Sequence, residues 1–403
     1  MAGAIFAAAS VAQAGIIIPA GDWTVDVGGN MNSFYTHKKT DLSGSATIGT
    51  TTYGGTGSLT DGNTIGTGLL PSAFGVGAKT RQNDIDTAVQ FSFFTGSSSG
   101  SGAAGGINTL NIRQAFLTFG DKSWGQFKLG RDLGVFGSDA ILSDMTLLGV
   151  GVSGATATAA GGNSTLGRIG SGYIYADWVG QIQYQTPNFS GFQITAAVSE
   201  PLSNSNTVLG FTNTVRKDMG YEAKATYDFA ASDVSGRVWV GGITQKHAAG
   251  AAGTSDANGY TSRGAEVGAK LAVHDLGLVG YYYDGKGLDS QLGTGGLKFG
   301  NGFKSDDRGG YVQATYVLPT KTKLGASWGR NESEGNVSAS INGKIENESW
   351  VIGAYHPLTK HLNLVAEYTN QEIKGNARTI SSGATANGKI DSDTYSLGAI
   401  LFF

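Results

Sequence analysis

The sequence predicts an all-β fold, a single transmembrane, antiparallel up-and-down β-barrel of about sixteen strands. Three observations predict it. Apolar and polar residues alternate with a period of two from Trp23 to the end of the chain. Short connections alternate with long ones rich in Gly, Ser, Thr and Asn, which is typical of barrels that cross membranes. The last segment is an alternating strand that ends in Phe403.

The composition excludes several other classes of protein. The 403 residues include 65 Gly, 18 Phe, 16 Tyr and 6 Trp, carry a net charge of −3 and contain no Cys. The near-neutral balance argues against a nucleic-acid partner bound through bulk positive charge, and the aromatic content argues against disorder. The lack of Cys excludes disulfides, thiol catalysis, iron–sulfur clusters and Cys-ligated zinc.

The first fourteen residues differ from the rest of the chain. They form a short apolar stretch that ends in Ala12-Gln13-Ala14, with the small residues Ala12 and Ala14 at the two positions that a signal peptidase requires. We therefore interpret residues 1–14 as the remnant of a clipped signal peptide and residues 15–403 as one barrel domain. The alternative is a buried helix or a frayed end. No later apolar run reaches the roughly 18 residues that a membrane helix needs.

The strands follow from the period-two alternation. In 221–229, Tyr221, Tyr227 and Phe229 share one face, and Glu222 and Lys224 share the other. No stretch has an apolar stripe of helical spacing and length. Sixteen alternating segments begin near residues 22, 73, 84, 109, 125, 177, 192, 219, 235, 261, 277, 308, 323, 348, 362 and 389.

The connections divide into two kinds, which predicts tight turns at one end of the barrel and long loops at the other. Short connections lie at 81–84, 121–124, 187–191, 231–235, 274–277, 319–322 and 356–361. Long connections lie at 40–70, 96–107, 199–216, 247–260, 285–306 and 331–346.

A soluble β-sandwich or β-solenoid also alternates, so three further features decide against it. The apolar positions are of uneven bulk, which suits fluid lipid better than a close-packed core. Aromatic residues gather near the segment ends, where membrane interfaces favour them. Charges recur on the opposite face, as a water-filled lumen permits. These charges are Asp86, Glu222, Lys224, Glu266, Lys270 and Glu367.

Residues 110–149 resemble the general porins of Gram-negative outer membranes. The matching stretches read NIRQAFLTFGDKSWGQFKLGRDLGVFG and SDAILSDMTLLGVG, and IQYQTPNFSGFQITAAVSEP at 182–201 resembles the same family. The resemblance implies a sixteen-stranded trimeric barrel in which a long loop after the fifth strand folds inward. That loop corresponds to about 134–176.

The resemblance also implies a charged pore constriction. Arg113 and Arg131 match the wall arginines, and Asp139 and Asp144 match the loop acids. Arg168 flanks the return of the loop and is a further candidate for the throat. Opposed charges across a narrow, low-dielectric throat create a transverse field.

The strand pattern gives both wall arginines a second interpretation. Strict alternation places Arg131 beside the apolar Leu129, so it points inward only if Gly130 carries a bulge or ends the strand. Arg113 similarly shares a face with Leu117. A role in holding the inserted loop is therefore as well supported as a role in selectivity, and the two are compatible.

The predicted function is a water-filled channel for passive diffusion of small hydrophilic solutes and ions across the outer membrane of a Gram-negative bacterium, with a weak preference for cations. The expected partners are lipid, lipopolysaccharide and two further copies of the chain. No cofactor, metal site or catalytic residue is predicted. G-x-G-x-x-G at 149–154 and G-x-S-x-G at 325–329 lack the helix that each motif requires. The alternatives are an enzyme on a barrel scaffold and an adhesin or receptor that uses its long loops.

Overall fold

The computed structural model describes residues 15–48, 51–97, 110–153, 164–201, 218–247, 258–288, 304–338, 341–380 and 384–403. The predicted signal remnant at 1–14 lies outside these residues. Within the described ranges, no helix is both long enough and apolar enough to cross a bilayer.

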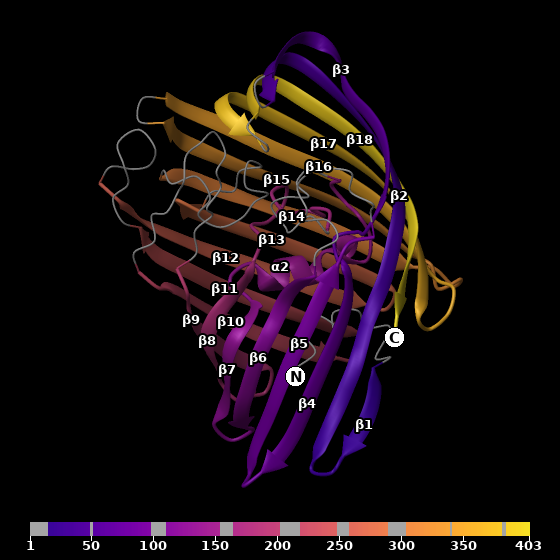
Figure 1. The fold of residues 1–403 in the computed structure, drawn as a ribbon, viewed down its shortest axis with the longest axis vertical. Helices are drawn as coiled ribbons and strands as arrows, with labels where there is room; N and C mark the ends of the chain where they lie inside the picture. Colours follow the sequence, from indigo (N-terminus) through magenta and orange to yellow (C-terminus); the bar gives the residue numbers. More distant parts are fainter. Residues whose placement is uncertain are drawn as a thin grey trace.

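The described strands form one closed antiparallel sheet (Figure 1). The strands are β1 (Ile16–Ala20), β2 (Trp23–Ile48), β3 (Thr51–Gly66), β4 (Ser72–Gln82), β5 (Ile85–Thr95), β6 (Asn111–Asp121), β7 (Gly125–Leu133), β8 (Trp178–Gln185), β9 (Phe192–Ser199), β10 (Gly220–Ala231), β11 (Val234–His247), β12 (Tyr260–Val273), β13 (Leu276–Lys286), β14 (Ser305–Val317), β15 (Lys323–Ser338), β16 (Ile341–Pro357), β17 (Leu362–Ile380) and β18 (Ala384–Phe402). Apart from β3 and β4, which both pair with β2, each strand pairs with its neighbours along the chain, and β18 closes the ring on β2.

These eighteen strands of the described chain occupy sixteen positions around the barrel. β3 pairs with residues 34–48 of β2, and β4 pairs with residues 24–30 of β2. β3 and β4 therefore follow each other along the same side of β2 and count as one position in the barrel. β1 pairs with residues 23–27 of β2, and β18 pairs with residues 30–47, so β1 continues the line of β18 past the chain end. The sixteen-stranded barrel that the sequence predicts is confirmed.

Fourteen of the sixteen predicted strand starts lie within three residues of an observed start, but β16 and β18 begin seven and five residues earlier than predicted. Two predicted long connections are wrong. Residues 40–70 are mostly strand, because β2 extends to Ile48 and β3 covers Thr51–Gly66. Likewise β15 reaches Ser338 and β16 begins at Ile341 within the predicted 331–346 connection. These segments extend past the apolar part of the barrel. With no lipid on either side, backbone pairing holds them together without any apolar alternation.

The two faces of the barrel wall differ as the alternation predicts. On β10, Tyr221 is 54% exposed on the outer face and Glu222 is 3% exposed on the inner face. Neighbouring strands continue the outer apolar surface with Val240, Val267 and Tyr282, which pair in register. Such a large exposed apolar surface is stable when it faces lipid.

Aromatic residues gather near the ends of the strands on the outer face. Phe127 packs against Phe119 and Tyr184 beside the short turns, with ring centroids 5.4 and 5.0 Å apart. Tyr368 and Tyr395 contact each other farther up the wall, at 5.1 Å. Rings at these two levels match the interfacial belts of a membrane-spanning barrel.

The end of the chain closes the barrel. The backbone of Phe403 exchanges two hydrogen bonds with Gly29 on β2, at 2.8 and 3.1 Å. On the same outward row as Phe403, Tyr395, Leu397 and Leu401 are exposed, as the sequence predicts. Because β18 and β2 pair fully, this seam leaves no backbone edge facing lipid.

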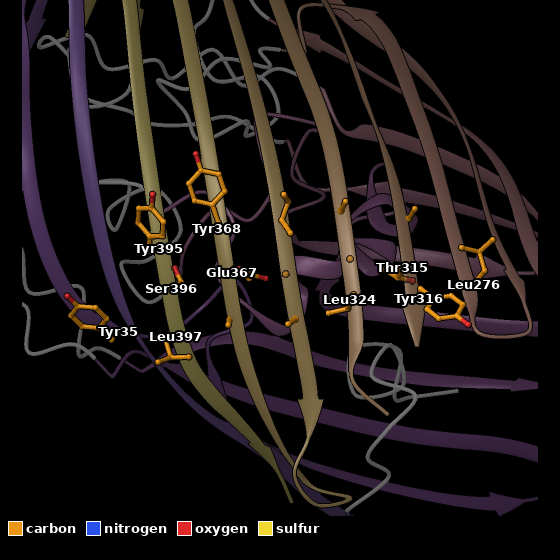
Figure 2. Close-up of a pocket in the computed structure, with 17 residues that line it drawn as sticks. Tyr35, Leu276, Thr315, Tyr316, Leu324, Glu367, Tyr368, Tyr395, Ser396 and Leu397 are labelled. Atoms are coloured by element: carbon orange, nitrogen blue, oxygen red, sulfur yellow. The ribbon is translucent and has the colours of Figure 1, made fainter. Parts of the chain in front are cut away.

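A shallow apolar groove runs over the outer face of β13–β18 and β2 (Figure 2). Small residues such as Gly353, Ala354 and Ala366 form its floor. Bulkier side chains, including Tyr316 and Leu397, rise around it. The groove is therefore part of the lipid-facing surface and not of the lumen.

Candidate functional site

The connection between β7 and β8 folds into the barrel. Its neck is closed by a hydrogen bond of 2.8 Å from the Gly134 N–H to the Asp177 carbonyl oxygen. It contains the short helix α2 (Ser138–Ser143) and the 3₁₀ turn η1 (Met145–Leu148). Figure 1 shows α2 inside the ring of strands. We call the described parts of this connection, residues 134–153 and 164–177, the inserted loop.

Buried carboxylates of the wall bind the backbone of the inserted loop. Glu222 on β10 accepts from the Phe136 N–H at 2.6 Å, and Glu266 on β12 accepts from the Gly137 N–H at 2.9 Å. Tyr281 on β13 donates to the same Glu266 carboxylate at 2.9 Å. The turn before α2 has no strand partner for its N–H groups, so these carboxylates satisfy donors that burial would otherwise leave unpaired.

A third carboxylate, Glu367 on β17, holds the far end of the inserted loop. It accepts from the N–H groups of Val150 and Gly151 at 2.8 Å each and from the Tyr355 hydroxyl at 2.5 Å. Gly149 approaches so closely that a Cβ placed there would lie 2.0 Å from a Glu367 oxygen. Only glycine allows this close approach, so the contact depends on Gly149.

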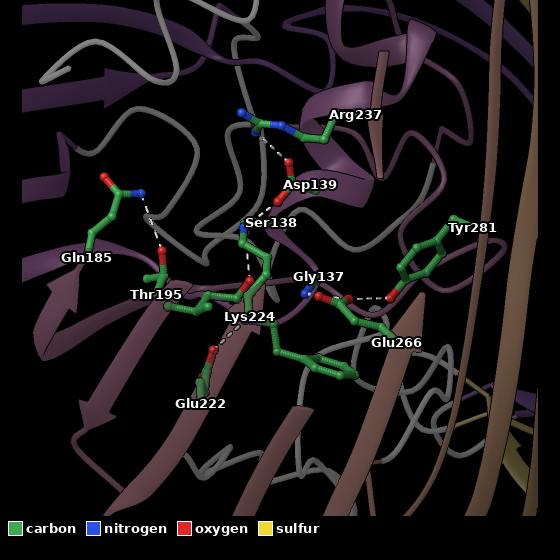
Figure 3. A network of polar contacts seen from close by, with 12 residues as sticks. Gly137, Ser138, Asp139, Gln185, Thr195, Glu222, Lys224, Arg237, Glu266 and Tyr281 are labelled. Carbon is green, nitrogen blue, oxygen red and sulfur yellow. Dashed lines mark hydrogen bonds and ion pairs between the residues drawn. The ribbon is translucent and has the colours of Figure 1, made fainter. Parts of the chain in front are cut away.

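Asp139, the acid on α2, lies among basic residues of the wall (Figure 3). It forms ion pairs with Lys224 on β10 and with Arg237 on β11, the latter at 3.0 Å. Burial by itself opposes ionisation of Asp139, but the two cations outweigh it and hold its pKa below the ordinary value. Arg237 also binds Asp228 through two nitrogens, at 2.6 and 2.7 Å.

Asp144 and Arg168, two predicted throat residues, are buried inside the inserted loop. Asp144 caps η1 by accepting from the Thr146 N–H at 2.9 Å, and it accepts from the Tyr173 hydroxyl at 2.8 Å. Arg168 is 0% exposed. It donates to the carbonyl oxygens of Ser327 and Ser349 on the wall, at 2.5 and 3.2 Å. Both residues therefore fasten the loop, and neither faces the open lumen.

Arg113 on β6 points inward because its strand carries a bulge. The register with β5 shifts so that Ser92 faces Gln114 and Phe93 faces Ile112, which makes Arg113 the extra residue of the bulge. The guanidinium lies 5.0 Å from the centre of the Phe94 ring, beneath the loop. The bulge thus removes the conflict with Leu117 that strict alternation predicts, and Arg113 is only 5% exposed.

Arg131 on β7 is not brought together with the loop acids. Gly130 has a left-handed φ of 120°, but the pairing of β7 with β6 and β8 runs through it without a shift. Arg131 therefore stays on the face of Leu129 and is exposed. The next residue, Asp132, points inward and binds Lys128 at 2.5 Å and Gln114 at 2.9 Å.

The partners of Asp139 are the residues that sequence reasoning missed. The sequence predicts that Lys224 faces the lumen, but it does not predict the ion pair of Lys224 with Asp139. It assigns no role to Arg237. Alternation along 234–247 places Arg237 on the inward row with Trp239 and Ile243, so that signal was available. Glu222, Glu266 and Glu367 were predicted to face the lumen. In the structure they also bind the backbone of the inserted loop.

The inserted loop is held against the inner face of the wall by several strands. The loop contacts β10, β12, β14 and β17 through side chains that face inward. Among the residues that the structure describes, no group of three or more His, Asp or Glu is placed to hold a metal ion.

Comparisons of the structure show which known folds it resembles. It is similar to the outer membrane channel DcaP of Acinetobacter baumannii, with a TM-score of 0.63 and 17% identity over 96% of this chain and 99% of that one. It is similar to the trimer form of in-vitro folded OmpT, an outer membrane protein of Vibrio cholerae. The TM-score is 0.53 and the identity is 15% over 94% of this chain and 99% of that one. It is also similar to an anion-selective porin from Comamonas acidovorans, with a TM-score of 0.55 and 14% identity over 93% of this chain and 100% of that one.

Comparisons of the sequence identify the family. No curated protein has a matching sequence. Residues 2–376 match the family described as Gram-negative porin. Because this match covers nearly the whole chain, the chain belongs to the Gram-negative porin family and is a β-barrel protein of the outer membrane.

Proposed function

We propose that the protein is a passive channel for small hydrophilic solutes and ions, and that the inserted loop sets its narrowest part. The observation that carries the proposal is the fastening of the loop to the inner wall by Glu222, Glu266 and Glu367. A loop held on several sides narrows the lumen permanently, as a size filter requires. Family membership supports the channel itself.

The charged part of the constriction is proposed to be Asp139 with Lys224 and Arg237. These side chains come from α2 and from two adjacent strands, and Arg237 is partly exposed. Arg113, Asp144 and Arg168 act in this proposal as fasteners of the loop. Arg131 is assigned no part in it, because it continues the outward row of β7.

The weak cation preference predicted from the sequence rests on Asp132 and on the loop acids Asp139 and Asp144. Both loop acids are buried, Asp139 against two cations and Asp144 against a tyrosine hydroxyl. Their charges are therefore largely compensated before an ion arrives. We propose that selectivity is weak and that the basic residues near α2 set its sign.

Planar-bilayer recording of the purified, folded protein tests the channel proposal directly. We expect stepwise conductance that grows with salt concentration and a permeability that falls steeply with solute size. Folding is checked independently by the heat-dependent shift in electrophoretic mobility that intact barrels show. A folded sample without conductance steps contradicts the proposal.

An enzymatic function has one structural feature to consider, the pair formed by His247 and Ser262. The His247 Nε2 lies 2.8 Å from the Ser262 Oγ, but that hydroxyl also donates to the Gly287 carbonyl oxygen at 2.7 Å and is 0% exposed. A buried hydroxyl of this kind does not reach a substrate. Assays for lipid and peptide hydrolysis by the purified protein test the enzymatic alternative.

An adhesin or receptor role predicts that trimming the long loops with a protease abolishes attachment.

The oligomer is proposed to be a homotrimer embedded in lipid and lipopolysaccharide. The trimer form of the similar OmpT structure supports this proposal. Small residues on the outer face, such as Ala326 and Ala354, let neighbouring barrels approach closely. Light scattering in mild detergent measures the mass, and a single-barrel mass contradicts the trimer.

A further inference from the structure

Three basic residues of the inner wall gather near the tip of α2. Lys224, Arg237 and Lys270 lie on the adjacent strands β10, β11 and β12. Arg237 pairs in register with Lys270 on one side and with Asp228 on the other. Residues opposite each other in an antiparallel ladder have Cβ atoms about 5 Å apart. The three side chains therefore reach the same part of the lumen.

The side chain of Lys270 faces the lumen on the turn side of α2. Lys270 lies four residues beyond Glu266, which binds the loop, and so shares its inward face. Four residues along a strand span about 13 Å, in the direction of the short turn at 274–275. In outer-membrane barrels the short turns lie on the periplasmic side. Lys270 therefore stands between the loop and the periplasmic mouth.

The acids nearby engage the other two cations. Asp139 binds Lys224 and Arg237, and Asp228 binds Arg237 through both of its oxygens. Among the residues that the structure describes, Lys270 forms no ion pair, and its side chain is exposed. Glu222 and Glu266, the other acids on these strands, accept from the loop backbone. Of the three cations, Lys270 is thus the one that is most open to the lumen.

We propose that Lys270 and Arg237 form a binding subsite for a small oxyanion, a solute that carries a carboxylate or phosphate group. Lys270 contributes an ammonium on an exposed side chain that forms no ion pair with the described residues, and the partly exposed Arg237 adds the neighbouring positive charge. Lys224 lies deeper, 13% exposed, and holds Asp139 in place. The subsite rests on the proposed channel function and gives that channel a class of preferred solute.

Single-channel recording with succinate and with inorganic phosphate tests the subsite. Either anion, added on the side of the short turns, is expected to reduce or interrupt the ionic current, with a Kd read from the concentration dependence. Glucose, an uncharged solute, is the negative control and is expected not to bind at this subsite. Lys270→Gln is expected to raise the Kd about tenfold, the usual effect of losing one charge-assisted hydrogen bond. Comparing the two anions identifies which oxyanion the site takes.

Two further variants separate a local site from a general electrostatic effect. Lys270→Arg keeps the charge and is expected to bind within about twofold of the original protein. Lys79→Gln is the matched control, because Lys79 is an exposed, inward-facing lysine on β4, away from α2, and its loss changes the net charge equally. It is expected to leave the Kd unchanged.

The outcomes distinguish this inference from the channel proposal. A conducting protein whose current is unaffected by succinate and phosphate overturns the subsite and leaves the channel standing. Equal Kd shifts in Lys270→Gln and Lys79→Gln also overturn it, because the effect is then one of overall charge. A folded protein with no conductance at all overturns the channel proposal itself.

Discussion

The Arg237 guanidinium of β11 and the Asp139 carboxylate of α2 lie 3.0 Å apart, although 98 residues separate them in the chain. This contact joins α2, the α-helix of the described loop, to the barrel wall. Lys224 binds the same carboxylate from β10. One acid thus fastens α2 to the wall and carries a charge in the proposed constriction, which makes it the most informative residue to change.

Asp139→Asn is expected to raise the ratio of anion to cation permeability by about twofold. A unit charge about 8 Å from a permeating ion in water contributes about 0.5 kcal/mol, and the change leaves Lys224 and Arg237 with less compensation. The reversal potential in a potassium chloride gradient measures the ratio. Asp144→Asn is the matched control, because Asp144 is buried against Tyr173. Equal shifts of the reversal potential in Asp139→Asn and Asp144→Asn contradict the assignment of Asp139 to the charged constriction.

The membrane-facing parts of the strands could be predicted from the sequence because lipid on one side and water on the other impose a period of two. Where that contrast ends, as in Thr51–Gly66, the signal ends while the backbone pairing continues. The bulge at Arg113 leaves no mark in hydropathy, so its inward direction was not predictable. The partners of Asp139 depend on the path of the loop through space, which no local pattern encodes.

Gly149→Ala is expected to loosen the far end of the inserted loop. The added Cβ would lie 2.0 Å from a Glu367 oxygen, so either the loop or the carboxylate must move. Overpacking of this kind costs about 1–3 kcal/mol. Greater open-channel current noise and a lower unfolding midpoint in detergent are the readouts. Gly280→Ala, where a Cβ meets nothing within 4 Å, is the control. Identical behaviour of the two variants argues against the contact.

Arg131→Gln is expected to leave the reversal potential and the conductance unchanged. Arg131 is exposed on the outward row of β7 and lies apart from the loop acids. The same recordings that test Asp139→Asn measure the effect. A clear loss of anion permeability in Arg131→Gln means that its side chain reaches the lumen, in disagreement with the register described above.

Arg168→Ala is expected to release the returning part of the loop while the barrel stays folded. The guanidinium is fully buried and donates to the carbonyl oxygens of Ser327 and Ser349. Each buried acceptor left without a donor costs about 1–3 kcal/mol. Limited proteolysis should therefore cleave within 134–177 faster, with the β-sheet circular-dichroism signal unchanged. Arg168→Lys should protect only partly, because an ammonium lacks the planar fork that reaches both carbonyls. Unchanged cleavage in Arg168→Ala means that the loop is held by its other contacts, chiefly those to Glu367.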